Sequence, residues 1–119
     1  MNRHVRIVSA LWVVVGIALA AWGVWGLATE GHETSVALSW LFELGFAALA
    51  TAAGLTFVRG TRLGRLLVRT VSVLALVYSL AWLFLGGIDD ASGYAPAILA
   101  FVALSIYGLA ASNLAPRAA

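Results

Sequence analysis

The sequence predicts an all-α transmembrane four-helix bundle in up-down-up-down order, with both ends of the chain on the cytoplasmic side. Two observations support this prediction. Of the 119 residues, 63% are hydrophobic and 10% are charged, whereas a soluble domain has roughly 25% charged residues. Arginine occurs only at the ends and the midpoint of the chain, and four of the five acidic residues lie in two short stretches between these places. We therefore expect a single integral membrane domain over residues 1–119.

Four apolar runs have the length of about 20 residues that crosses a bilayer as a helix. We expect the spans at 7–28, 36–58, 66–88 and 96–113. The first run continues past the small-residue triplet at 18–20, which resembles a signal cleavage site. Because the run extends well beyond it, we expect a retained helix rather than a cleaved signal.

The connections between the runs are short and contain residues that end or begin helices. The first, 29–35, finishes with two hydroxyl residues that can cap the next helix. The second, 59–65, contains two glycines, and the third, 86–93, consists of turn residues shortly before Pro96. Connections this short place consecutive helices antiparallel.

Arginine also predicts the orientation, because cytoplasmic loops retain an excess of basic residues. The topology determinants are Arg3, Arg6, Arg59, Arg62, Arg65 and Arg69. We expect both termini to be cytoplasmic in a multi-pass protein of the bacterial cytoplasmic (inner) membrane. The expected partners are the lipid bilayer and another membrane protein or a second copy of this chain.

The second run is rich in small residues, which allow other helix backbones to approach closely. We expect it to be the central helix, with one set of residues buried against its neighbours: Gly45, Ala48, Ala52 and Gly54. The third run has bulkier side chains, suited to lipid or to another subunit.

Two polar or aromatic groupings lie near the outer ends of the spans. An interfacial aromatic belt is the favoured interpretation of Trp22, Trp25, Trp40, Trp82 and Tyr94, with an aromatic cage for a cation as the alternative. The outer loops carry Glu30, His32, Glu33, Asp89 and Asp90. We expect these to form a solvated face rather than a metal site, because their spacing matches no ligand motif.

Glu43 is the one acidic residue inside an apolar run, and intramembrane acids are candidate functional sites. Counting from the outer ends of the spans places Tyr78 and Ser79 at a similar depth. We therefore predict a candidate intramembrane polar site of Glu43, Tyr78 and Ser79. A protonated Glu43 bonded to a hydroxyl is favoured, a proton- or cation-coupled site is the first alternative, and contact with water is the second.

Enzymatic chemistry is not expected, and we expect no catalytic residue, cofactor or metal. Cys is absent, and the only histidines, His4 and His32, fall on opposite sides of the predicted membrane. The basic residues include no Lys and gather where they orient the chain, which argues against a nucleic-acid partner.

The joint between the second and third runs carries one resemblance. Residues 54–67 read Gly-Leu-Thr-Phe-Val-Arg-Gly-Thr-Arg-Leu-Gly-Arg-Leu-Leu. This passage resembles the joint in many small uncharacterised four-span bacterial inner-membrane proteins, where two apolar helices flank an Arg-Gly-x-Arg turn. The resemblance implies the four-span topology and no particular activity.

Two functions of different classes follow from these features. The favoured one is a non-enzymatic integral membrane protein that acts by helix packing, as a structural or accessory subunit. The alternative is a small proton- or cation-coupled transporter that uses Glu43.

The orientation can be tested with single cysteines, because the natural chain has none. We expect Glu33→Cys to react with a membrane-impermeant maleimide in intact cells and Thr61→Cys to react only after permeabilisation. Labelling of Thr61→Cys in intact cells, with Glu33→Cys protected, would reverse the orientation.

Overall fold

The computed structural model describes residues 3–30, 33–85 and 95–114. Regular structure in these residues is helical throughout and comprises α1 (Arg3–Glu30), α2 (Thr34–Phe57), α3 (Arg62–Leu85) and α5 (Ala95–Leu114). Each of these helices contains a segment long and apolar enough to cross a membrane. The all-α prediction with four candidate spans is therefore confirmed for the described residues.

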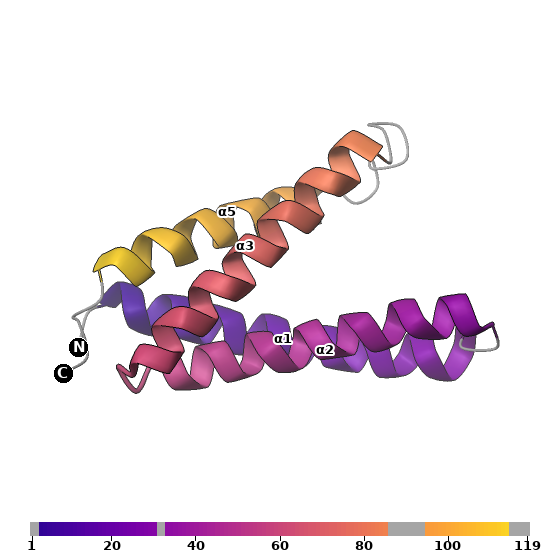
Figure 1. Cartoon of the computed structure of the whole chain (residues 1–119), viewed down its shortest axis with the longest axis horizontal. Helices are drawn as coiled ribbons and strands as arrows, with labels where there is room; N and C mark the ends of the chain where they lie inside the picture. Colours follow the sequence, from indigo (N-terminus) through magenta and orange to yellow (C-terminus); the bar gives the residue numbers. More distant parts are fainter. Residues whose placement is uncertain (1–2, 31–32, 86–94, 115–119) are drawn as a thin grey trace.

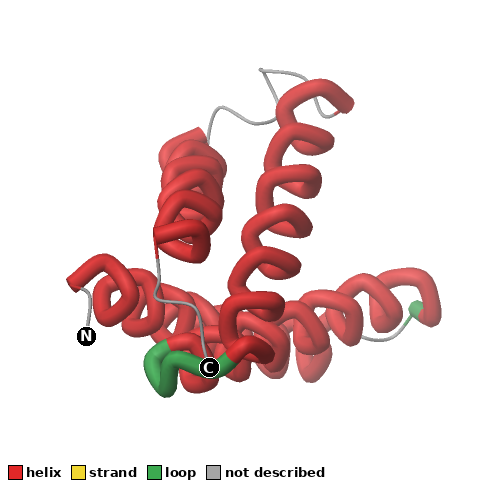
Figure 2. The backbone as a smooth tube through the Cα atoms, turned by 60° about the vertical axis from the view of Figure 1, so that its left-hand side comes forward, coloured by secondary structure: helices red, strands yellow, loops and turns green. Residues whose placement is uncertain are grey.

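Two helix pairs make up the molecule (Figure 1). α1 and α2 lie side by side over their whole lengths, and α3 and α5 form the second pair. The pairs meet near the chain termini and diverge toward the opposite end, as the turned view in Figure 2 also shows. α1 contacts α2 and α5, and α3 contacts α2 and α5. The molecule is consequently long and flat, measuring 47 × 28 × 17 Å.

A tight turn joins α2 to α3 at the end where the pairs meet. Gly60 has a φ of +73°, a left-handed conformation that glycine adopts without a steric penalty. Thr61 then caps α3: its Oγ1 accepts a hydrogen bond from the Gly64 backbone N–H at 2.9 Å and donates one to the Thr56 carbonyl at 3.1 Å. Gly64 has no side chain, so α3 begins directly against the backbone of Thr56 and Phe57.

The core occupies the half of the molecule where the two pairs meet. Its largest fully buried apolar side chains come from three helices: Trp12 and Val8 on α1, Phe57 on α2, and Val68 and Val71 on α3. The Trp12 ring packs edge-on against Phe46 of α2, with ring centroids 6.4 Å apart and an interplanar angle of 71°. Beyond this region most large apolar side chains are exposed, as expected of surfaces that face lipid.

Hydroxyl groups within the helices bond to their own backbone. Thr51 and Thr56 on α2, Thr70 on α3 and Ser105 on α5 each donate to the carbonyl four residues earlier, at 2.6 to 2.9 Å. Because lipid offers these groups no partner, the local bond allows a hydroxyl to remain in an apolar helix.

The packed face of α2 differs from the predicted one. Gly54 is buried, with the place of its absent Cβ 2.5 Å from the Ser9 carbonyl oxygen, and Ala52 is half-buried. Ala48 is exposed, and nothing lies within 4 Å of the Cβ position of Gly45, so the prediction is wrong for these two residues. The alanines that are buried instead are Ala47, Ala50 and Ala53. Small residues surround α2 on every side, so composition alone could not distinguish one face from another.

Two glycines on the same helix provide a matched test of this packing. We expect Gly54→Ala to lower the free energy of unfolding by about 1–3 kcal/mol, because the added methyl group meets the backbone of α1. Gly45→Ala adds the same group to open space and should leave stability unchanged or raise it by up to about 1 kcal/mol. Unfolding of the detergent-solubilised protein, followed by circular dichroism, measures both. Equal effects would show that α1 and α2 do not pack as described.

Candidate functional site

Glu43 lies in the interface between α1 and α2. The place of the absent Cβ of Gly23 on α1 is 3.7 Å from Glu43 Oε2 and 2.8 Å from Leu44 Cδ2. Three residues further along α1, the indole of Trp40 lies so close to the place of the absent Cβ of Gly26 that a side chain there would clash with it. Residues three apart share a helix face, so these two glycines open a shallow track in α1 that accepts side chains of α2.

Tryptophans cluster beside this carboxyl group. The Trp22 ring lies 5.4 Å from that of Trp25 and 6.2 Å from that of Trp40, measured between centroids. Trp22 and Trp25 are about half exposed, which suits rings at a membrane interface. The two other members of the predicted belt, the Trp82 side chain and Tyr94, lie outside the described residues.

The Glu43 carboxyl group has an unusual environment. Its Oε1 is buried and makes no hydrogen bond to any described residue. No described cationic side chain forms an ion pair with it. A buried carboxyl oxygen costs free energy unless a proton, a hydrogen-bond donor or a cation satisfies it. This arrangement can bind a proton or a small cation between α1 and α2.

The predicted hydrogen bond from Glu43 to Tyr78 or Ser79 is not formed. Ser79 is buried in α3, whereas Tyr78 is 60% exposed. The two helix pairs diverge away from the chain termini (Figure 1), and the carboxyl group lies against Gly23 of α1 instead.

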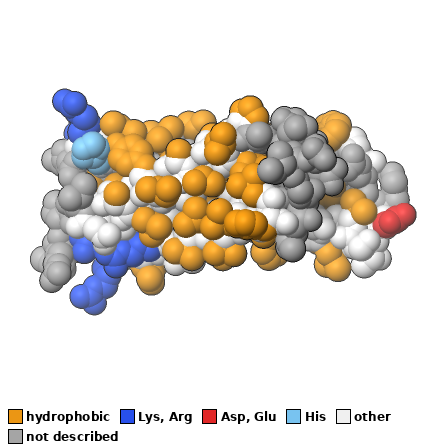
Figure 3. All heavy atoms as spheres, turned by 90° about the horizontal axis from the view of Figure 1, so that it is seen from above, with side chains coloured by type: hydrophobic (Ala, Val, Ile, Leu, Met, Phe, Trp, Pro, Cys, Tyr) orange, Lys and Arg blue, Asp and Glu red, His pale blue; other side chains and the backbone are white. Residues whose placement is uncertain are grey.

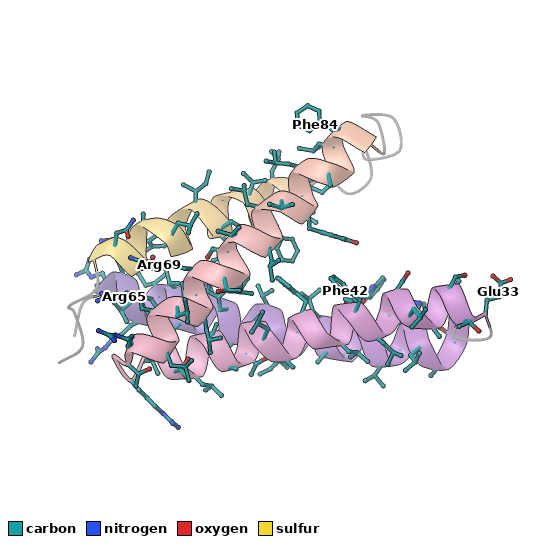
Figure 4. The ribbon with its side chains drawn as sticks, viewed as in Figure 1. Glu33, Phe42, Arg65, Arg69 and Phe84 are labelled. Carbon is teal, nitrogen blue, oxygen red and sulfur yellow. The ribbon has the colours of Figure 1, made fainter. Side chains whose placement is uncertain are left out.

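The predicted topology determinants all lie toward one end of the molecule. Arg3 and Arg6 are in the first turn of α1, Arg59 lies in the α2–α3 turn, and the remaining three arginines lie on the first two turns of α3. Figure 3 shows arginine at this end of the visible face and an acidic side chain at the opposite end. Of the acidic and histidine residues expected in the outer loops, only the side chain of Glu33 is described. It is exposed and projects from the tip of the α1–α2 pair (Figure 4).

Metal ligands do not gather in the part of the chain that the structure describes, where no group of three His, Asp or Glu side chains is found. Glu30, His32, Asp89 and Asp90 cannot be judged on this point, because their side chains lie outside the described residues.

Two polar contacts between helices were not predicted. Arg69 of α3 donates from Nε to Ser112 Oγ at 3.2 Å and from Nη2 to Asn113 Oδ1 at 2.7 Å, both on α5. His4 Nδ1 of α1 lies 2.7 Å from the Tyr107 hydroxyl of α5, and the two rings meet edge-on. The sequence does place hydrogen-bonding side chains near the predicted cytoplasmic ends of three spans. Which of these side chains pair could not be predicted, because the pairing depends on where α5 packs.

A second group of unsatisfied polar atoms lies in the core. Ser9 Oγ and Trp12 Nε1 on α1 and Ser72 Oγ on α3 are buried without a hydrogen bond to a described residue. Trp12 Nε1 and Ser72 Oγ both approach the Cβ position of Gly108 on α5. These groups offer hydroxyl and N–H chemistry but no titratable residue.

Comparisons of the chain with protein-family models, curated proteins and solved structures find no match.

Glu43 can be tested for a structural role by replacing it with an apolar side chain of similar length. We expect Glu43→Met to raise the free energy of unfolding in detergent by about 1–3 kcal/mol, because an unsatisfied buried oxygen is removed. Glu43→Gln retains a polar group and should change stability less. A loss of stability in Glu43→Met would show that the carboxyl group is a structural contact.

Proposed function

We propose that this small integral membrane protein is a non-enzymatic accessory subunit that acts by helix packing against another membrane protein or a second copy of itself. In this proposal the four helices cross the bacterial cytoplasmic membrane in up-down-up-down order, with both termini in the cytoplasm. The excess of arginine at one end of the molecule supports this orientation.

The proposal rests on two helix faces that are buried in the core half of the molecule and exposed in the other half. On α2, Phe57, Ala53, Ala50, Phe46 and Phe42 follow one another at intervals of three or four residues and so share a face. Exposure along this face rises from 2% at Phe57 to 73% at Phe42. The face that packs in the core is therefore uncovered in the outer half of the helix.

The facing surface of α3 changes in the same way. Gly64, Val71 and Tyr78 are seven residues apart and lie on one face. Gly64 packs on α2 and Val71 is fully buried, but Tyr78 is 60% exposed. Figure 4 places Phe42 on the side of α2 toward α3 in this view. Phe42 and Tyr78 thus lie on the faces through which the two helix pairs pack in the core. A helix of a partner protein could insert between the pairs at this level and contact both side chains.

Photo-crosslinking at these positions tests the proposal. We expect p-benzoylphenylalanine at Phe42 or Tyr78 to form a protein adduct in native membranes, because these aromatic positions would contact the partner. The adduct mass distinguishes a second 12.5 kDa copy from another protein. Val14 and Ile106, which are similarly exposed on α1 and α5, serve as controls and should yield lipid adducts. Absence of a protein adduct at Phe42 and Tyr78, or equal adducts at all four positions, would contradict the proposal.

The alternative function is proton- or cation-coupled transport, and the unsatisfied Oε1 of Glu43 favours it. Intramembrane acids without a fixed partner are common in proton relays and ion pathways. Under this alternative, proteoliposomes show a proton- or cation-dependent flux that Glu43→Met abolishes without loss of stability. A flux that is absent from the natural protein, or unchanged in Glu43→Met, would exclude it.

A further inference from the structure

The hydroxyl group of Ser72 on α3 is directed away from its own helix. Thr70 on the same helix and Ser105 on α5 donate to the carbonyl four residues earlier, which satisfies a hydroxyl in an apolar helix. Ser72 is fully buried but makes no such bond, and no described residue bonds to its Oγ. Its Oγ instead meets the place of the absent Cβ of Gly108 on α5. The hydroxyl is therefore available to a partner at the contact between α3 and α5.

The indole N–H of Trp12 reaches the same place from α1. Trp12 is fully buried, and its Nε1 lies 3.2 Å from the Cβ position of Gly108. This Nε1 likewise makes no hydrogen bond to a described residue. An indole N–H can only donate, whereas a hydroxyl can donate and accept. Two buried polar atoms with complementary chemistry, one from α1 and one from α3, thus converge on one point beside α5.

The surroundings of these two atoms limit what can satisfy them. A buried polar group without a hydrogen bond lowers stability, and lipid cannot supply one. The core around Trp12 includes Val8, Val68 and Val71, whose side chains have no polar atom. A partner must accept a bond from the indole N–H and also bond to the hydroxyl. It must be small as well, because Gly108 brings the backbone of α5 close to both atoms. Water meets all of these requirements.

We propose that one buried water molecule binds beside Gly108 and connects α1, α3 and α5. It accepts a hydrogen bond from Trp12 Nε1 and donates one to Ser72 Oγ. A water that bridges two protein groups is enthalpically nearly as good as a direct hydrogen bond. Because Trp12 belongs to the α1–α2 pair and Ser72 to the α3–α5 pair, the bound water links the two helix pairs within the core. This site is independent of the proposed function, which uses neither residue.

Nuclear magnetic resonance of the full-length protein in detergent tests the site. The protein is labelled with ¹⁵N-tryptophan, and the Trp12 indole N–H signal is assigned by its loss in Trp12→Phe. We expect a cross-peak between this N–H proton and the water resonance. Its sign should be opposite in laboratory-frame and rotating-frame spectra, as a long-lived bound water requires. Absence of this cross-peak from the natural protein would overturn the proposal.

A matched pair of glycine variants distinguishes bound water from proton exchange through the Ser72 hydroxyl. Gly108→Ala retains the indole and the hydroxyl but adds a methyl group where they converge, so we expect the cross-peak to be lost. Gly45→Ala adds the same group to open space on α2 and should leave the cross-peak unchanged. Persistence of the cross-peak in Gly108→Ala would show that exchange through the hydroxyl produces it, and would contradict the proposal.

A high-resolution crystal structure of the natural protein keeps the test decisive if Gly108→Ala does not fold. We expect an ordered water about 3 Å from both Trp12 Nε1 and Ser72 Oγ. A direct hydrogen bond between these two atoms would overturn the proposal. Donation by Ser72 to the carbonyl of Val68, four residues earlier, would overturn it as well.

Discussion

Close approach of helix backbones is the constraint on which the rest of this structure depends. In lipid, helices gain little from burying apolar side chains, and they associate where small residues let their backbones meet. Here Gly54 of α2 meets α1, Gly64 of α3 meets the end of α2, and Gly108 of α5 meets Ser72 of α3. Each contact joins a different pair of helices, and all three lie in the half where the two pairs come together. The core around Trp12 is located there for the same reason.

Polar side chains also hold the two helix pairs together at one end of the molecule only. At the arginine end, Arg69 and His4 bond to side chains of α5 and so tie that helix to both α3 and α1. At the other end, the described helices share no comparable bond between the two pairs, and Phe42 and Tyr78 are exposed. The molecule is thus closed at one end by packing and hydrogen bonds and open at the other, where apolar faces continue beyond the core.

Glu43 takes part neither in the core packing nor in the hydrogen bonds at the arginine end. The glycine track of α1 accommodates its side chain, but no described donor satisfies Oε1. A packing role alone would be served as well by an apolar side chain, since replacing an unsatisfied buried polar group by an apolar one is close to neutral or stabilising. Glu43 is therefore the residue whose chemistry most clearly separates an accessory subunit from a coupled transporter.

The sequence by itself determined the helical class and the approximate helix positions. Twenty-residue apolar runs bounded by turn residues leave the backbone no other way to bond internally in lipid. The predicted spans at 7–28, 36–58 and 96–113 accordingly coincide with α1, α2 and α5 to within a few residues. The sequence also identified Glu43 as the one acid within an apolar run.

Only the tertiary structure decided which faces meet. Small residues occur all around α2, so the buried face followed from the glycines of α1 and not from composition. The pairing of Glu43 with Tyr78 or Ser79 assumed parallel packing of all four helices, but the two pairs diverge and place the carboxyl group against Gly23. In the sequence, Arg69 indicated only the orientation of the chain in the membrane. Its hydrogen bonds to Ser112 and Asn113 form because α5 packs beside α3, which the sequence did not show. Depth along a helix can be counted from the sequence, but the angle between helices depends on contacts between residues distant in the chain.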